Sequence, residues 1–135
     1  IDQESLHTGM KACQDRNIGV IIGAPFASGI LATGSAGAAH YNYSAADAFV
    51  IEKVRQIEAV CNAHGVSLQA AALQFPLAHP AAAAIIPGAA KPEEMAANIA
   101  SLDVQIPLQF WNDLKSEGLI DLEAPIPGDT LGSST

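Results

Sequence analysis

Small residues follow an apolar run near the start of the sequence, in a pattern that suits the binding of a phosphate group. The run covers residues 18–23, and Ala24, Ser28 and Gly29 come after it. Small side chains let a backbone approach a ligand closely and donate its N–H groups to it. The pattern indicates a pyrophosphate loop, whereas a lone glycine-rich loop most often only forms turns.

A second loop has the same character and is followed by the start of a helix. Gly88 and Ala89 end the short apolar run that begins at Ala83, and Pro92 opens a helical pattern a few residues later. The first turn of a helix has N–H groups without intrahelical partners, and these attract anions. Two such loops in this order favour a binding role over plain turns.

The segments that must position these loops are strands and helices in alternation. Residues 18–23 and 83–87 are apolar without alternation, which is typical of buried parallel strands covered on both faces. Apolar periodicity predicts helices over residues 5–16, 44–64, 68–78, from 92 and 107–117. The order is helix, strand, long helical crossover, strand, helix, helix, and it belongs to the βα class of folds.

Local signals indicate where the helices begin and end. Residues 44–47 have the form of a capping box, and Ser67 can cap the helix that follows Gly65. Gly118 ends the last helix, and the tail from Leu119 is expected to be irregular. The residues expected to point inward from the last two helices are Met95, Ile99 and Leu102, then Leu108, Trp111 and Leu114.

Composition excludes two classes of partner. The net charge is −8, with six basic residues against fourteen acidic ones. That balance opposes binding to nucleic acid or to an anionic membrane. Residues 1–11 do not have the pattern of a signal peptide. Half of the 135 residues are apolar, so the chain is long enough for one domain and buries most of what it folds. So apolar a chain suggests that some faces are covered by protein outside this sequence.

The two cysteines and the histidines suggest structural roles. Cys13 and Cys61 lie on apolar helix stripes without the spacing of a metal site, so we expect two buried thiols and no metal, as in a cytoplasmic protein. His7 is expected to be a solvated helix residue, His64 a helix end and His79 a turn residue.

Three stretches together resemble the aldo-keto reductase family, whose members are (β/α)8 barrels that bind an extended nicotinamide dinucleotide. The stretches are residues 23–31, 68–80 and 85–98, and they occur in the family's order and spacing. The first is similar to the loop after the family's seventh strand, and the third to its eighth strand and adenine-binding helix. Residues 40–44 and 57–61 are most similar to the aldose dehydrogenases of the family and their pyridoxal dehydrogenase relatives.

The resemblance implies that residues 1–135 are the C-terminal part of a TIM barrel, with about two βα units, a C-terminal helix and a tail. Two strands cannot close a barrel, and a family barrel needs about 250 residues or more. The chain is therefore expected to be a fragment whose partner is the missing N-terminal half of the barrel.

The resemblance also implies a function. The complete protein is expected to be an NAD(P)-dependent oxidoreductase that transfers hydride between a nicotinamide cofactor and an aldose or aldehyde. This chain would hold the cofactor. The residues expected to bind it are Ala24, Pro25, Phe26, Ser28, Gly29, Leu31, Pro87, Gly88, Ala89, Glu94 and Asn98.

The sequence departs from the family pattern at two positions. Gly23 stands where members often place an aromatic ring against the nicotinamide, so Phe26 or a ring from elsewhere would have to cover that face. Glu94 stands where members that prefer NADP place a basic side chain, although Lys91 is nearby. We therefore expect NAD as the cofactor, with NADP possible.

No motif of the family's catalytic tetrad of Asp, Tyr, Lys and His is present in this chain. The residues within reach by sequence are His40, Tyr41, Tyr43, Asp47 and Lys53. They are more simply explained as loop and helix-surface residues, or as aromatic residues that shape a substrate mouth. A non-catalytic nucleotide-binding or scaffold subunit is the alternative to an enzyme.

Overall fold

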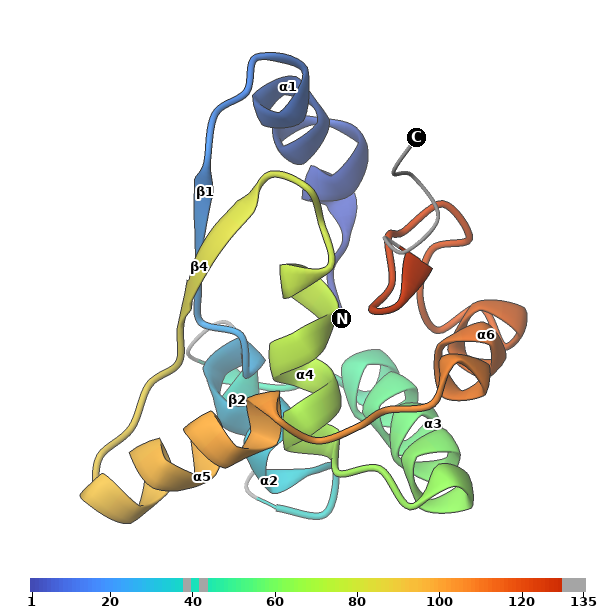
Figure 1. The fold of residues 1–135 in the computed structure, drawn as a ribbon. Coiled ribbons are helices and arrows are strands. Elements are labelled where there is room, and N and C mark those ends of the chain that lie inside the picture. The colour runs from blue at the N-terminus through green and yellow to red at the C-terminus, as the bar shows by residue number, and fades with distance from the viewer. Residues whose placement is uncertain (38–39, 42–43, 130–135) are drawn as a thin grey trace.

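A small parallel sheet lies along one side of the molecule (Figure 1). The computed structural model describes residues 1–37, 40–41 and 44–129. Strand β1 (Val20–Gly23) pairs in parallel with β4 (Ala82–Ile86), and the register sets Gly23 beside Ile86. The two apolar runs are therefore neighbouring strands, as the sequence predicts.

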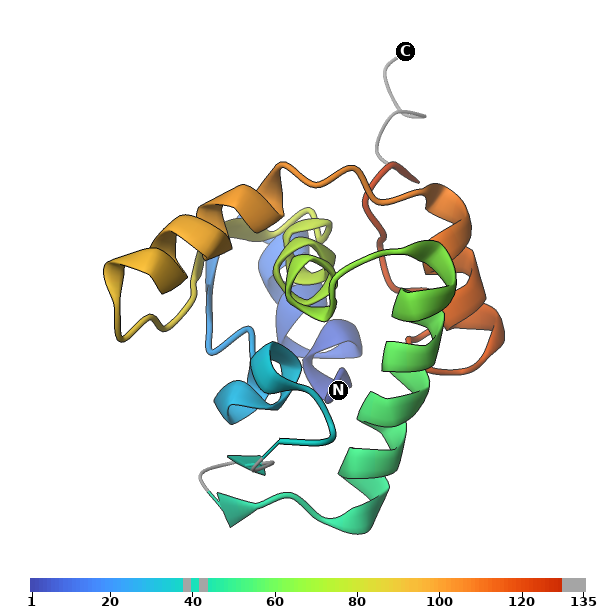
Figure 2. The ribbon, with the colours of Figure 1, turned by 90° about the horizontal axis from the view of Figure 1, so that it is seen from below.

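One helix lies at the centre of the fold and contacts most of the others. The elements besides the sheet are η1 (Glu4–His7), α1 (Gly9–Asp15), η2 (Ala27–Gly29), α2 (Ile30–Thr33), β2 (His40–Tyr41), β3 (Ser44–Ala45), α3 (Ala48–His64), α4 (Leu68–Leu77), α5 (Pro92–Leu102) and α6 (Leu108–Ser116). Helix α4 contacts β4, α5, α2 and α3, and α3 packs on α6 (Figures 1 and 2). Within the described part of the chain, no helix is long and apolar enough to cross a membrane.

Most helix ends lie where the sequence predicts them. The Ser67 side chain accepts a hydrogen bond from the Ala70 N–H, and Gly65 ends α3 in the left-handed conformation. The capping box is wrong. Asp47 is itself the N-cap of α3, where its carboxylate accepts the Val50 N–H at 2.9 Å, and Ser44 lies in β3. A carboxylate next to the first turn caps it directly, so the helix begins later than predicted.

The first predicted helix is broken into two. Residues 4–7 form a 3-10 turn and α1 begins only at Gly9, because Thr8 adopts φ −116° and ψ −94°. The Thr8 hydroxyl donates to the carbonyl oxygen of Glu4 at 3.2 Å. A threonine that bonds its own backbone and a following glycine both disfavour a continuous helix.

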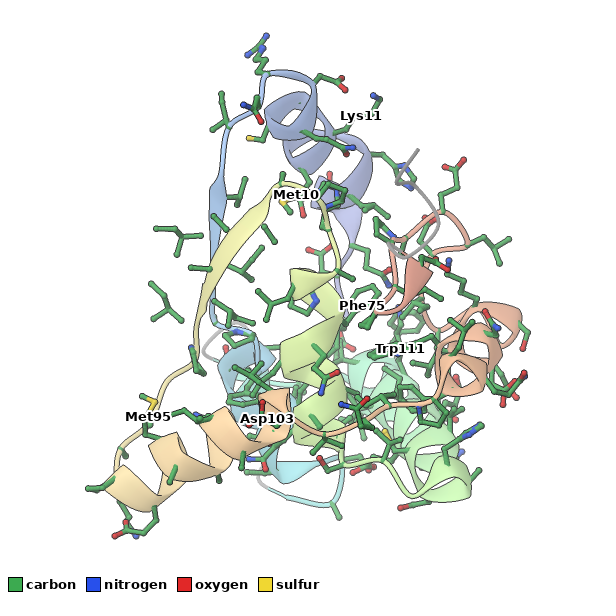
Figure 3. All side chains as sticks on the ribbon, viewed as in Figure 1. Met10, Lys11, Phe75, Met95, Asp103 and Trp111 are labelled. Carbon is green, nitrogen blue, oxygen red and sulfur yellow. The ribbon has the colours of Figure 1, made fainter. Side chains whose placement is uncertain are left out.

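The larger of two buried clusters joins α3, α6 and the tail. Phe110 and Trp111 are its most buried rings, and Phe75 of α4 lies across from Trp111 with ring centroids 6.1 Å apart (Figure 3). The tail is irregular, as predicted. It is nevertheless buried at Leu119 and Ile126, and therefore belongs to the core.

The second cluster ties the loop after β1 to the helices. It contains Phe26, Ile30, Leu31, Val50, Val54 and Leu73. These side chains come from the loop, α2, α3 and α4. The segment after β1, predicted from its small residues to be a loop, therefore contains two short helical turns that are anchored in the core.

Several predicted inward faces are exposed. Met95, Ile99 and Leu102 are all exposed, whereas Asn98 and Ser101 of the same helix are buried. Figure 3 shows Met95 at the outer end of α5. Gln74 of α4 donates to the carbonyl oxygens of Ser101 near the end of α5 and of Val104 just after it, so polar contacts join α4 to the end of this helix.

The sheet is also covered on one face only. Ile21 is 63% exposed and Ile86 is 60% exposed, so the expectation of two covered faces is wrong for this chain. Leu108 of α6, which was predicted to point inward, is exposed as well. Phe110 of the same helix is buried in its place. These apolar side chains are exposed in the described part of the chain.

The two cysteines differ in environment. Cys61 is buried, and burial together with the nearby Glu58 carboxylate raises the pKa of its thiol to about 11. Cys13 is only half-buried, because the short α1 leaves part of its apolar side uncovered. Both cysteines are free thiols.

Candidate functional site

The two loops predicted to bind a phosphate lie at the same edge of the sheet. Gly23 and Ile86 are paired at the ends of β1 and β4, so Ala24 and Pro87 begin adjacent loops (Figure 1). The carboxyl ends of parallel strands are where ligands bind in βα folds. The topology therefore brings together the two segments that the sequence singles out.

The first loop has an unusual backbone. Ala24, Ala27 and Ser28 adopt φ values of 50°, 49° and 62°, and Gly29 follows with φ 102°. Each non-glycine residue in such a conformation costs about 1–2 kcal/mol. Strain of this kind persists only where the surroundings enforce it, and it gathers at sites that clamp ligands. The loop is therefore strained at three non-glycine positions.

Two apolar side chains enforce that conformation. Phe26 and Leu31 are each 8% exposed and lie in the second core cluster. The Phe26 carbonyl oxygen accepts hydrogen bonds from the N–H groups of Gly29 and Leu31 at 3.0 and 3.1 Å. Phe26 is therefore an anchor of the loop, and its ring packs into the protein interior. Pro25, beside it, is half-buried.

The second loop is held by two side chains of α5. The Glu94 carboxylate accepts the Ala90 N–H at 2.7 Å, and the Asn98 amide donates to the Gly88 carbonyl oxygen at 3.4 Å. Asn98 is only 4% exposed, whereas Gly88 is exposed to solvent, as is Ala89 beside it. Both predicted cofactor residues of α5 thus fix the loop that precedes their helix.

The start of α5 carries opposing electrostatic features. Pro92 occupies its first turn, as predicted, and the helix dipole there favours an anion. Glu93 and Glu94 lie in the same turn and place negative charge beside it. The carboxylates of Glu93 and Glu94 would therefore repel a phosphate bound at the start of α5.

A cavity of about 440 Å³ borders the first loop. Ala24 and Ser28 lie on its wall together with Met10 of α1, Phe75 of α4 and His79. His79 accepts the Ala81 N–H on Nδ1, and burial lowers the pKa of its ring. No residue of the second loop lines this cavity, so the cavity borders the first loop alone of the two.

Two of the residues weighed as a local catalytic set, Asp47 and Lys53, make separate structural contacts. The Asp47 carboxylate caps α3, and the Lys53 ammonium donates to the Ile1 carbonyl oxygen at 3.1 Å. His40 and Tyr41 lie in the β2 strand, and Tyr43 lies outside the described residues. No hydrogen bond or ion pair joins Asp47 to Lys53 in the described part of the chain.

His7 has a partner that the sequence did not reveal. Its Nε2 lies 2.8 Å from the Asp121 carboxylate, and its Nδ1 lies 3.7 Å from that of Glu123. The hydrogen bond with Asp121 raises the pKa of His7 and lowers that of Asp121. This exposed group joins η1 to the tail, and it is best explained as an ion pair between two ends of the chain.

Glu58 is the residue near the first loop that sequence reasoning missed. Periodicity places it on the polar side of α3. In the fold its carboxylate reaches Ser35, which follows α2. No sequence pattern connects Gly34 and Ser35 to Glu58, because Ser35 and Glu58 are 23 residues apart.

Comparisons with known proteins identify the family of this chain. Residues 5–117 match the sequence model of the aldo/keto reductase family. The chain is 37% identical over 120 residues to pyridoxal 4-dehydrogenase from Microbacterium luteolum, and 27% identical over 121 residues to D-threo-aldose 1-dehydrogenase from a Pseudomonas species. These matches cover 89% of this chain but only 35% and 37% of the two relatives. The chain belongs to the aldo/keto reductase family.

Proposed function

We propose that this chain forms the dinucleotide-binding portion of an NAD-dependent oxidoreductase that acts on an aldehyde or an aldose. The observation that carries the proposal is the pair of loops at the ends of β1 and β4 in a chain of this family. Both relatives are dehydrogenases by name. The bound cofactor would supply the hydride acceptor for the oxidation.

The residues of the two loops fit a pyrophosphate. A Cβ added at Gly23, Gly29 or Gly88 would meet no other atom within 4 Å, so the backbone is open to a close approach there. The N–H groups of Ala27 and Gly29 donate to the carbonyl oxygens of Ala24 and Phe26, so they hold the loop in its strained conformation. The loop is thus suited to bring its backbone close to a pyrophosphate.

Residues of α5 would recognise the adenosine half of the cofactor. Asn98 has an amide that can donate to and accept from the edge of a purine. Glu94 places a carboxylate where a 2′-phosphate would be repelled, while an unphosphorylated ribose hydroxyl could donate to it. Lys91 precedes the helix and would offset the repulsion only if its ammonium reached the same phosphate. On balance we assign NAD as the preferred cofactor and NADP as the weaker one.

The catalytic groups of the proposed reaction would come from further barrel strands. The exposed Ile21 and Ile86 lie on the uncovered face of the sheet, and both strands have an unpaired edge. A closed barrel would cover that face and pair those edges. We propose that the remainder of the barrel is the partner of this chain, and that the protein works in the cytoplasm, where the free thiols Cys13 and Cys61 stay reduced.

The test is a binding and turnover experiment on the complete natural polypeptide that carries these 135 residues. NAD⁺ and NADP⁺ are titrated separately by calorimetry, and a panel of aldoses and aldehydes is then assayed for NADH formation. We expect NAD⁺ to bind more tightly and at least one substrate to be oxidised. Binding without turnover on any substrate would support a nucleotide-binding scaffold, and the absence of binding would overturn the proposal.

A further inference from the structure

The chain that leaves α2 is fastened to α3 by one carboxylate. The Ser35 N–H donates to Oε1 of Glu58 at 3.1 Å, and the Ser35 hydroxyl donates to Oε2 of the same side chain. Ser35 and Glu58 are 23 residues apart in sequence. A single serine therefore occupies both oxygens of a half-buried carboxylate, and hydrogen bonds to a charged acceptor are about twice as strong as those between neutral groups.

The residue before Ser35 is shaped to admit this carboxylate. Gly34 is buried and adopts φ 83° and ψ 177°, a conformation that is almost confined to glycine. A Cβ at Gly34 would collide with Oε1 of Glu58. The missing side chain of Gly34 thus provides the space in which Glu58 reaches Ser35.

A continuous series of contacts leads from Glu58 back to the strained loop. Gly34 donates its N–H to the Ile30 carbonyl oxygen at 2.9 Å, and the Thr33 hydroxyl donates to the Gly29 carbonyl oxygen at 3.2 Å. Helix α2 lies between these contacts and has only four residues. So short a helix is unstable by itself, and it keeps its shape only if both ends are held.

The two ends of this segment are held by different means. Phe26 and Leu31 hold its beginning through burial in the core. Its end is held by the carboxylate of Glu58, which belongs to the 17-residue helix α3. The thiol of Cys61, three residues after Glu58 in α3, stays protonated because burial and the Glu58 charge raise its pKa to about 11.

We propose that Glu58 is a positioning residue that holds the strained segment from Ala24 to Thr33 in the conformation that binds the dinucleotide. The inference rests on the proposed function of that segment. In this role Glu58 does not contact the cofactor itself. It acts through Ser35 and α2 on the loop backbone that would approach the pyrophosphate.

The test compares three variants of the complete natural polypeptide: Glu58→Ala, Glu58→Gln and the control Glu52→Gln. Glu52 lies on the same helix and pairs with Arg55 at the surface, so its variant removes a carboxylate without touching the loop. We expect Glu58→Ala to raise the Kd and the KM for NAD⁺ about tenfold, with kcat at saturating NAD⁺ within about twofold of the parent. Glu58→Gln keeps an acceptor for the Ser35 N–H, so it should recover most of the affinity.

Two further measurements keep the outcomes distinct. Ser35→Ala removes only one hydrogen bond, and it should raise the Kd about threefold even if Glu58→Ala does not fold. Amide exchange of the cofactor-free parent and variants reports the conformation of residues 27–35 directly. The inference is overturned if Glu58→Ala binds NAD⁺ as tightly as Glu52→Gln, or if exchange in this segment is unchanged. A parent that binds no dinucleotide refutes the proposed function, while faster exchange in Glu58→Ala would still support the restraint on the loop.

Discussion

Replacing Gly34 with alanine tests the link between backbone conformation and the Glu58 contact. Two free energies add at this position. Alanine at φ 83° and ψ 177° costs about 1–3 kcal/mol, since only glycine adopts that region readily. The new methyl group also occupies the place of the Glu58 carboxylate, so both hydrogen bonds to Ser35 are lost, at a cost of about 1.5–3 kcal/mol. We expect Gly34→Ala to lower the free energy of unfolding by about 4 kcal/mol.

The two contributions separate in a double-mutant cycle with Glu58→Ala. In that background the hydrogen bonds to Ser35 are already absent, so Gly34→Ala should cost only the conformational part, about 2 kcal/mol. The free energies of unfolding are measured by urea titration of the complete, cofactor-free polypeptide. The expected coupling between the two sites is about 2 kcal/mol. If Gly34→Ala costs the same in both backgrounds, Glu58 does not use the space at Gly34 and the reasoning fails.

Three other substitutions probe the second loop and the tail. Glu94→Arg should raise the ratio of kcat/KM for NADP⁺ over NAD⁺ about tenfold, because it removes a repulsion of roughly 1–2 kcal/mol, and an equal shift in the control Glu93→Arg would show a general charge effect instead. Asn98→Ala should raise the KM for NAD⁺ several-fold with kcat within about twofold; an unchanged KM would mean that Asn98 only packs. His7→Gln should destabilise the protein at about pH 5.5 and not at about pH 9, because Asp121 raises the pKa of His7, so its contribution is present below about pH 6.5 and lost as the pH rises through the raised value. Equal destabilisation of unfolding at both pH values would contradict that explanation.

The parts of the fold that depend on local chemistry could be predicted from the sequence. Unalternated apolar runs identified β1 and β4, and Ser67 and Gly65 fixed helix ends, because a cap or a left-handed turn depends on the residue itself. The small residues after β1 predicted a loop at the carboxyl end of that strand, and the structure has one there with an unusual backbone. The fold of the loop nonetheless decides which alanine and serine residues adopt a positive φ. No pattern in the sequence identifies those residues.

The errors at the helix faces came from treating every apolar stripe as an inward face of this chain, although the composition suggests that some faces are covered by protein outside it. Met95 and Ile99 repeat with helical spacing, yet α5 presents Asn98 to the interior. Periodicity finds the apolar side of a helix but does not say which neighbour lies against it. Long-range polar contacts were missed for a related reason: the pairs Glu58 with Ser35 and His7 with Asp121 are brought together only by the tertiary fold.

The most direct test of the central claim is the amide exchange of the complete natural polypeptide with and without saturating NAD⁺. If the loops after β1 and β4 bind the dinucleotide, residues 24–31 and 87–98 should both become protected from exchange. Helix α6, which lies on the far side of the core, should be unchanged and serves as the internal control. Protection of both loops together would support the dinucleotide site. NAD⁺ binding that leaves both loops unprotected, or the absence of binding, would contradict it.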